Sequence, residues 1–170
     1  MEMEDDCDFY HEYLRGLEVC HTEVEDEFEY ISGNMVDDHL CPHRFYIEHK
    51  CFIMYHGTTW ANAMKIQSEG FTPSLDGMLG RGVYLSHDYT KASRYPIQGR
   101  HQRLAVIKVN VQVGLVKRIN YQGHPLQKSW HQHGYDTAWV PPKCGMVPSG
   151  LEEDCVCDPR RIQVLEIIPN

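Results

Sequence analysis

The segment 104–116 constrains the fold more than any other part of the sequence. After an apolar run, β-branched residues alternate through Val109, Val111 and Val113, which is typical of a strand buried in a sheet. Shorter apolar runs predict further strands at 52–55, 83–86, 137–140, 155–157 and 162–168. Because strands dominate the last two-thirds of the chain, we expect a mixed α+β domain.

Two short helices are expected between these strands. The apolar run 52–55 stops at the polar stretch 56–59, which predicts a turn and then a threonine cap on a helix that ends at Gly70. Asp88 can cap a second helix, which Pro96 would end.

The first thirty residues differ from the rest in charge. They hold twelve acids and one base, a net charge of −11, whereas the whole chain carries −8 and the remaining 140 residues therefore +3. Apolar side chains recur among these acids at helical spacing and predict two short amphipathic helices; the alternative is a disordered acidic arm. The apolar positions are Phe9, Tyr10, Tyr13, Leu14 and Leu17, then Val24, Phe28 and Ile31. We divide the chain into an acidic helical segment, 1–50, and a larger domain, 51–170.

Length, cysteine usage and charge limit the class of protein. A chain of 170 residues can hold one core and is short for two domains. No apolar run approaches the roughly 18 residues of a membrane span, and the acidic N-terminus does not resemble a secretory signal. Seven scattered cysteines, an odd number, suggest reduced thiols, as in the cytosol or nucleus, and we expect a cytoplasmic location. The acidic balance argues against nucleic acid as a partner, because phosphates are bound by Lys and Arg.

A glycine-rich loop, Gly77-x-x-Gly80-x-Gly82, precedes the expected strand at 83–86. This order excludes two phosphate-binding motifs. The dinucleotide fingerprint follows a strand and opens a helix, and the P-loop requires a Gly-Lys-Ser/Thr sequence. Taken alone, the loop could equally be a flexible surface loop.

Four segments that follow one another in a fixed order resemble a known family. They are His56-Gly57-Thr58, Gly80-Arg81-Gly82-Val83-Tyr84-Leu85-Ser86, the helix with Lys91 and Tyr95, and Glu153-Asp154-Cys155-Val156-Cys157-Asp158. Together they resemble the catalytic domain of the poly(ADP-ribose) polymerase (PARP), or diphtheria-toxin-like ADP-ribosyltransferase, superfamily of the His-Tyr-Glu type. The glycine loop and the helix after it look closest to the virus-induced, interferon-responsive PARP-like proteins of fish. The resemblance implies a split β-sandwich with short flanking helices that binds NAD and transfers ADP-ribose.

The resemblance also implies a role for each matching residue. His56 would bond a ribose hydroxyl of the adenosine half, since a neutral imidazole can donate and accept. Gly57 would bring bare backbone to the nicotinamide carboxamide, two tyrosines would hold the nicotinamide ring between them, and the loop 72–80 would lie over the pyrophosphate. The expected NAD-binding residues are His56, Gly57, Thr58, Tyr84, Lys91 and Tyr95.

Glu153 resembles the catalytic acid of the family, and His56 and Tyr84 complete the triad. Cleavage of the nicotinamide–ribose bond builds positive charge on the ribose, which a carboxylate stabilises in the transition state. Strand alternation turns Glu152 away from the face of Glu153 or into the preceding turn, so Glu153 is preferred and Glu152 is the rival. Lys91 would help to orient the glutamate.

The chain departs from the family at Ala92, where many members have a serine that bonds the carboxamide. The sequence therefore does not predict how tightly the pocket binds nicotinamide, although the catalytic triad is still present. Histidines and cysteines also suggest zinc, but neither candidate group has the spacing of a zinc site, and we expect no metal. The two groups are Cys20, His21, His39, Cys41 and His43, and then His131, His133 and Cys144.

The leading hypothesis is an NAD-dependent mono-ADP-ribosyltransferase that transfers ADP-ribose to a protein acceptor. The resemblance to virus-induced proteins adds an antiviral role in innate immunity. Chain extension is less favoured, because the segment 120–150 has no evident cluster of bases for a second ADP-ribose. The alternative is a catalytically weak or inactive module that keeps the fold and an NAD or ADP-ribose pocket and acts by protein contact. A third hypothesis, transfer to RNA or DNA ends, is not encouraged by the charge distribution.

Overall fold

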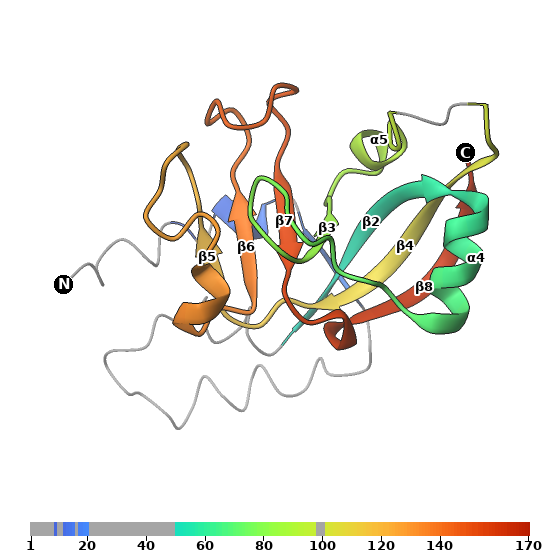
Figure 1. Ribbon diagram of the computed structural model, residues 1–170, viewed down its shortest axis with the longest axis horizontal. Helices are drawn as coiled ribbons and strands as arrows, with labels where there is room; N and C mark the ends of the chain where they lie inside the picture. The colour runs from blue at the N-terminus through green and yellow to red at the C-terminus, as the bar shows by residue number, and fades with distance from the viewer. Residues whose placement is uncertain (1–8, 10–11, 16, 21–49, 98–100) are drawn as a thin grey trace.

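The computed structural model describes residues 9, 12–15, 17–20, 50–97 and 101–170. Within this part of the chain, eight strands form two four-stranded sheets (Figure 1). The first sheet has the order β1 (Glu18–Val19), β2 (Cys51–Thr59), β4 (Leu104–Gln112) and β8 (Ile162–Pro169). The second has the order β3 (Val83–Leu85), β7 (Glu153–Val156), β6 (Thr137–Val140) and β5 (Val116–Arg118). Neighbouring strands are antiparallel except for the parallel pair β5–β6, and the expected α+β fold is confirmed.

The helices are short, as expected. They are α4 (Trp60–Glu69) and α5 (Tyr89–Ala92), with single 3₁₀ turns at Trp130–His133 and Pro159–Arg161. Thr59 caps α4 by accepting a hydrogen bond from the Asn62 amide, and Gly70 ends it at a φ of 85°. Asp88 caps α5 through the Lys91 amide. The α5 helix ends at Ala92, earlier than its expected end before Pro96.

The predicted turn after residue 55 is wrong. Strand β2 continues to Thr59, and its ladder with β4 includes the pairs Gly57 with Val106 and Thr59 with Leu104. Gly and Thr favour turns locally, but nine residues of backbone pairing with a long neighbouring strand override that preference here.

The predicted strand 104–116 is divided between the two sheets. β4 ends at Gln112 in the first sheet, and β5 begins at Val116 in the second. The chain changes sheet at Gly114, which has a φ of 61° and lies so close to Asp136 that an added Cβ would be 2.3 Å from its carboxylate oxygen. Only glycine fits this position without strain. The two strands expected at the C-terminus, β7 and β8, likewise belong to different sheets.

The main hydrophobic core draws on both sheets. Its buried side chains include Phe52, Met54, Ile107, Val109 and Val111 from the first sheet and Leu85, Trp139 and Val156 from the second. A second buried cluster consists of Leu79, Ile119, Trp130, Ala138, Val140 and Cys155. Alternation along β7 therefore gives the strand one face toward each cluster.

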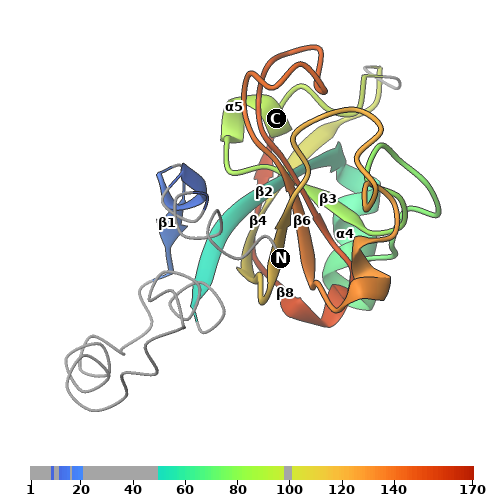
Figure 2. The same cartoon turned by 90° about the vertical axis from the view of Figure 1, so that its left-hand side faces the viewer.

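The described part of the N-terminal segment packs onto this core. Residues 12–14 are helical, Phe9 and Tyr13 are buried in the main cluster, and β1 pairs with β2 (Figure 2). The strand β1 is not expected from the sequence. The second predicted helix, around Val24–Ile31, lies outside the described residues, and the division at residue 50 stays a prediction. No helix in the described ranges is long and apolar enough to cross a membrane.

Candidate active site

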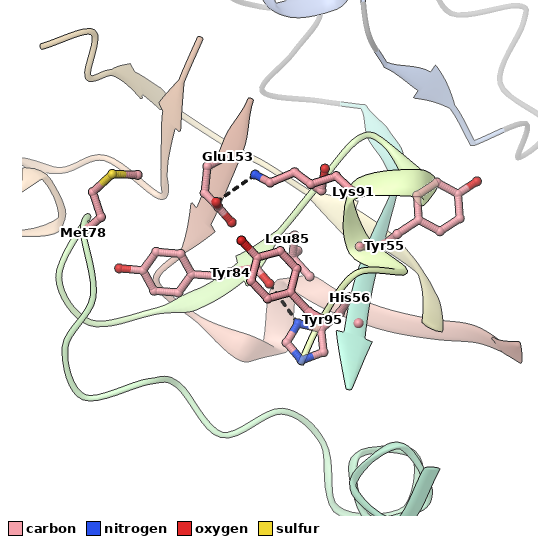
Figure 3. Close-up of a pocket in the computed structure, with 11 residues that line it drawn as sticks. Tyr55, His56, Met78, Tyr84, Leu85, Lys91, Tyr95 and Glu153 are labelled. Carbon is pink, nitrogen blue, oxygen red and sulfur yellow. Dashed lines mark hydrogen bonds and ion pairs between the residues drawn. The ribbon is translucent and has the colours of Figure 1, made fainter. Parts of the chain in front are cut away.

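A cavity of about 300 Å³ lies where the two sheets meet beside α5 (Figure 3). Tyr55 of β2 and Ser86, just after β3, join the sheets there by two backbone hydrogen bonds of 2.8 and 3.0 Å. The volume is at the lower end of the range for small-molecule pockets, roughly 300–1,000 Å³. The lining residues are Tyr55, His56, Gly57, Met78, Tyr84, Leu85, Ser86, Lys91, Ala92, Tyr95 and Glu153. Five of the six expected NAD-binding residues and the expected catalytic acid are among them; Thr58 is buried and does not line the cavity.

His56 is held as a neutral acceptor. Its Nδ1 lies 2.9 Å from the carbonyl oxygen of Tyr84, and because a carbonyl only accepts, Nδ1 carries the proton. Burial lowers the pKa of His56 below its usual value, since it disfavours the imidazolium. The lone pair is therefore on Nε2. The ring also packs edge-on against Phe71, 5.3 Å away.

Gly57 lies where no side chain fits. An added Cβ would be 1.8 Å from the carbonyl oxygen of Ala92 and 2.9 Å from that of Tyr95. The backbone of β2 thus packs directly on the turn after α5. The Ala92 methyl is buried, and the neighbouring Ser93 donates its hydroxyl to the Thr90 carbonyl at 2.7 Å. The Ser93 hydroxyl is therefore bonded to the backbone of α5, and Ser93 does not line the cavity.

Tyr84 is fastened to the glycine-rich loop. Its hydroxyl donates to the carbonyl of Gly80 at 2.6 Å and accepts from the amide of Leu79 at 3.0 Å. An added Cβ at Gly77 would lie 2.4 Å from this hydroxyl. Burial raises the pKa of Tyr84 well above its usual value, so the neutral hydroxyl can both donate and accept. The loop glycines thus let the backbone close around the tyrosine.

The same loop is held from its other side. Trp130 donates its indole N–H to the carbonyl of Leu79 at 2.8 Å, and Gln127 donates to that of Met78 at 3.0 Å. These bonds fix the loop at the edge of the cavity. Tyr95 borders the cavity from the segment after α5, and 40% of its surface is exposed (Figure 3).

Glu153 and Lys91 form a buried ion pair at the cavity. Lys91 Nζ lies 2.7 Å from Glu153 Oε2, and their side chains are 2% and 17% exposed. The ammonium also donates to the backbone carbonyl of Glu152. Burial raises the pKa of Glu153, and Lys91 opposes this shift. Lys91 therefore favours the ionised carboxylate in a site that otherwise disfavours it.

Glu152 does not line the cavity. Its Oε1 accepts hydrogen bonds of 2.8 Å from the Ser86 hydroxyl and from the His87 amide. Among the described residues, the potential metal-ligating atoms that converge are those of His87, Glu152 and Asp154. The candidate group His131, His133 and Cys144, which lacks the spacing of a zinc site, is not among the groups whose ligand atoms converge. The zinc candidates at 21–43 lie outside the described residues.

Sequence reasoning missed four lining residues. Tyr55 was expected only as a strand residue. Met78 lies in the loop 72–80, and Leu85 and Ser86 belong to the segment Gly80–Ser86, but none of these three was given a site role of its own. Residues near a strand end or in a glycine loop could have been proposed from position alone, because ligands often bind at such edges.

Two sheets with a cavity lined by residues of both are the architecture expected of an ADP-ribosyltransferase. The chain belongs to the poly(ADP-ribose) polymerase catalytic domain family, which matches residues 18–140, more than half of its length. NAD is the substrate in this family, which uses no metal cofactor, and membership supports NAD⁺ ADP-ribosyltransferase activity in general. The match includes His56, Tyr84 and Lys91 and ends before Glu153. A comparison with curated proteins finds no match.

Proposed function

We propose that this chain is a mono-ADP-ribosyltransferase of the His-Tyr-Glu type, which cleaves the nicotinamide–ribose bond of NAD and transfers ADP-ribose to a protein acceptor. The observation that carries the proposal is the convergence of His56, Tyr84 and Glu153, from three different strands, on one cavity. Independent structural roles for the three would not require a common cavity.

Each group has a chemical task in this reaction. Nε2 of His56 accepts a hydrogen bond from a ribose hydroxyl of the adenosine half, and the bare backbone at Gly57 faces the carboxamide. The tyrosine rings of Tyr84 and Tyr95 bind the nicotinamide, each contact contributing about 0.5–1.5 kcal/mol. The ionised Glu153 accepts a hydrogen bond from the nicotinamide ribose and stabilises the positive charge that develops at C1′.

The bond changes balance without a further reactant. The C1′–N bond breaks with its electron pair, so nicotinamide leaves as a neutral molecule. The acceptor side chain bonds to C1′ and loses its proton to solvent. Lys91 supports the step because it favours the carboxylate form of Glu153.

Transfer of a single ADP-ribose is supported by the charge of the segment before Glu153. Extension of a chain needs a site for the two phosphates of an ADP-ribose already attached. Residues 141–152, which lead into β7, contain one base, Lys143, and its side chain is exposed. One solvated lysine is a poor diphosphate site.

The cellular setting is also part of the proposal. The resemblance of the glycine loop and the helix after it to virus-induced PARP-like proteins supports an antiviral role in innate immunity. The odd number of cysteines supports a cytoplasmic location. A catalytically weak NAD-binding module is the second candidate, and the absence of a hydroxyl at Ala92 favours it.

The test incubates the purified chain with NAD labelled in both halves and compares it with Glu153→Gln. Wild type releases nicotinamide and labels an acceptor protein, and Glu153→Gln loses about 10²–10³ in rate. Glu166→Gln, an exposed glutamate on β8, is the matched control and keeps full activity. If wild type binds NAD by calorimetry but releases no nicotinamide, the module replaces the enzyme. If Glu152→Gln is inactive and Glu153→Gln is active, Glu152 is the catalytic acid.

A further inference from the structure

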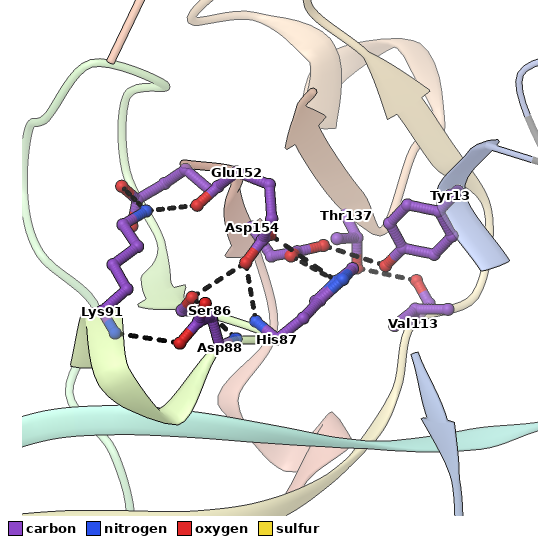
Figure 4. A network of polar contacts seen from close by, with 10 residues as sticks. Tyr13, Ser86, His87, Asp88, Lys91, Val113, Thr137, Glu152 and Asp154 are labelled. Carbon is purple, nitrogen blue, oxygen red and sulfur yellow. Dashed lines mark hydrogen bonds and ion pairs between the residues drawn. The ribbon is translucent and has the colours of Figure 1, made fainter. Parts of the chain in front are cut away.

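Figure 4 shows a buried polar network that includes Tyr13, His87 and Asp154. Asp154 follows Glu153 in β7, and because side chains alternate along a strand, the network lies on the face opposite to Glu153. His87 Nε2 is 2.6 Å from Asp154 Oδ2. The hydroxyl of Tyr13 donates to the other oxygen, Oδ1, at 2.9 Å. Asp154 is fully buried, so its carboxylate depends on these two partners in place of water.

Glu152, on the other side of Glu153, is held by Ser86 and His87, the two residues that follow β3. Ser86 and the amide of His87 both donate to Glu152 Oε1 at 2.8 Å, and His87 Nε2 is 3.7 Å from Glu152 Oε2. The residues on either side of Glu153 in sequence, Glu152 just before β7 and Asp154 within it, are therefore both held by groups outside that strand. Among the described residues, His87 contacts both of them.

Tyr13 brings the N-terminal segment into this network. Its side chain is completely buried, and its ring packs edge-on against His87 at 5.3 Å and Trp139 at 5.1 Å. It is 141 residues away in sequence from the aspartate it bonds. The helical residues around Tyr13 and the strand β1 hold it against the core, because β1 pairs with β2.

The contacts behind β7 hold the backbone on both sides of Glu153. The carboxylates of Glu152 and Asp154 both lie beside His87, whereas Glu153 lines the cavity. A shift of either neighbour would therefore move the backbone that carries Glu153. Lys91 adds a second link, since its ammonium bonds both Glu153 Oε2 and the Glu152 carbonyl. Misplacement of a reacting group by about 1 Å can cost about 100-fold in rate.

We propose that Tyr13 is a positioning residue for Glu153. It acts through Asp154 and His87, and it makes the described part of the N-terminal segment (residues 9, 12–15 and 17–20) a support of the active site. The inference rests on the proposed function, because that function gives Glu153 its role in the reaction. It adds that the enzyme needs a residue far outside the four segments of the NAD site.

The first test is the activity of Tyr13→Phe, which keeps the ring and removes the hydroxyl. We expect kcat to fall about 10- to 100-fold, while KM for NAD stays within about twofold because no NAD-binding residue is touched. The matched control is Phe9→Leu, which perturbs packing against the same Trp139 but offers no polar atom to Asp154. It keeps kcat near the wild-type value. Equal losses in the two variants would mean that packing alone matters and would overturn the proposal.

The second test does not depend on turnover. In protein labelled with ¹³C at glutamate carboxyls, the Glu153 resonance is assigned by its absence in Glu153→Gln. Tyr13→Phe shifts this resonance and Phe9→Leu leaves it in place. An unshifted resonance with wild-type kcat refutes the positioning role. If wild type releases no nicotinamide, the proposed function fails while the resonance still decides whether Tyr13 positions Glu153.

A double variant tests whether Tyr13 acts on Glu153 through Asp154. Tyr13→Phe added to Asp154→Asn lowers kcat no further if both act through one contact, whereas independent effects multiply. Multiplying losses would exclude Asp154 as the intermediary.

Discussion

Replacing Lys91 with methionine removes the one buried cation beside Glu153 in the described part of the chain and keeps an unbranched side chain of similar length. In the folded protein, Lys91 Nζ is 2.7 Å from Glu153 Oε2, and both groups are largely shielded from water. The substitution leaves a buried carboxylate without its counter-charge. It therefore tests whether Lys91 keeps Glu153 ionised.

The size of the effect follows from the geometry. At 2.7 Å, Coulomb's law with an effective dielectric constant of about 20 gives an attraction of about 6 kcal/mol. Loss of one partner of a buried pair typically costs about 3–5 kcal/mol. Because 17% of the Glu153 side chain is exposed, we take the lower end of this range, about 3 kcal/mol. A change of this size shifts the equilibrium between carboxylate and neutral carboxyl toward the neutral form by about 100-fold.

The pH dependence of nicotinamide release is the assay. Burial already raises the pKa of Glu153, and Lys91 opposes that shift, so its loss raises the pKa further. The ascending limb of kcat against pH then moves to higher pH, and the rate at pH 7 falls about 10- to 100-fold. Lys65→Met, an exposed lysine on α4, leaves the profile unchanged. An ascending limb that stays in place in Lys91→Met refutes the reasoning, whatever the rate.

Three further predictions concern binding and stability. Tyr84→Phe keeps the ring but loses both hydroxyl bonds to the loop, and it weakens NAD binding in calorimetry by about 1–2 kcal/mol; an affinity equal to that of wild type would show that the loop needs no anchor. Gly57→Ala places a methyl 1.8 Å from the Ala92 oxygen and lowers the free energy of unfolding in urea by about 3 kcal/mol or more; a stable variant would contradict that packing. Burial raises the pKa of Glu152 to about 8, and Asp154 and Glu152 raise that of His87 in spite of its burial. The folded state then binds more protons than the unfolded state between about pH 5 and 8, so the free energy of unfolding falls as pH rises through this window. Glu152→Gln makes the fall shallower in denaturation curves, and an unchanged slope would exclude Glu152 as its source.

Local patterns predicted those parts of the fold in which neighbouring residues set the structure. Thr59 and Asp88 cap helices because their side-chain oxygens bond amides three residues ahead, a contact that is visible in the sequence. Strand alternation placed Glu153 and Glu152 on different faces. The tyrosines of the site came from motif order, and Tyr84 and Tyr95 do border one cavity.

Long-range pairing decided what the sequence alone could not predict. The polar residues after Tyr55 resemble a turn, but they continue β2 because β4 pairs with them. The change of sheet at Gly114 depends on Asp136, 22 residues further on. Tyr13 has the spacing of an amphipathic helix, which indicates burial but cannot show that its hydroxyl bonds Asp154.

The position of the cavity between the sheets affects stability as well as chemistry. His56 and Gly57 belong to the first sheet, and Tyr84 and Glu153 to the second. The two sheets contact each other through the hydrophobic core and through the backbone hydrogen bonds between Tyr55 and Ser86. A ligand that binds in the cavity and contacts both sheets adds a further, reversible connection between them. At 100 times its Kd such a ligand stabilises the fold by about 2.7 kcal/mol. The rise in Tm measured with nicotinamide, with ADP-ribose and with intact NAD would therefore rank these ligands by how well each one connects the two sheets.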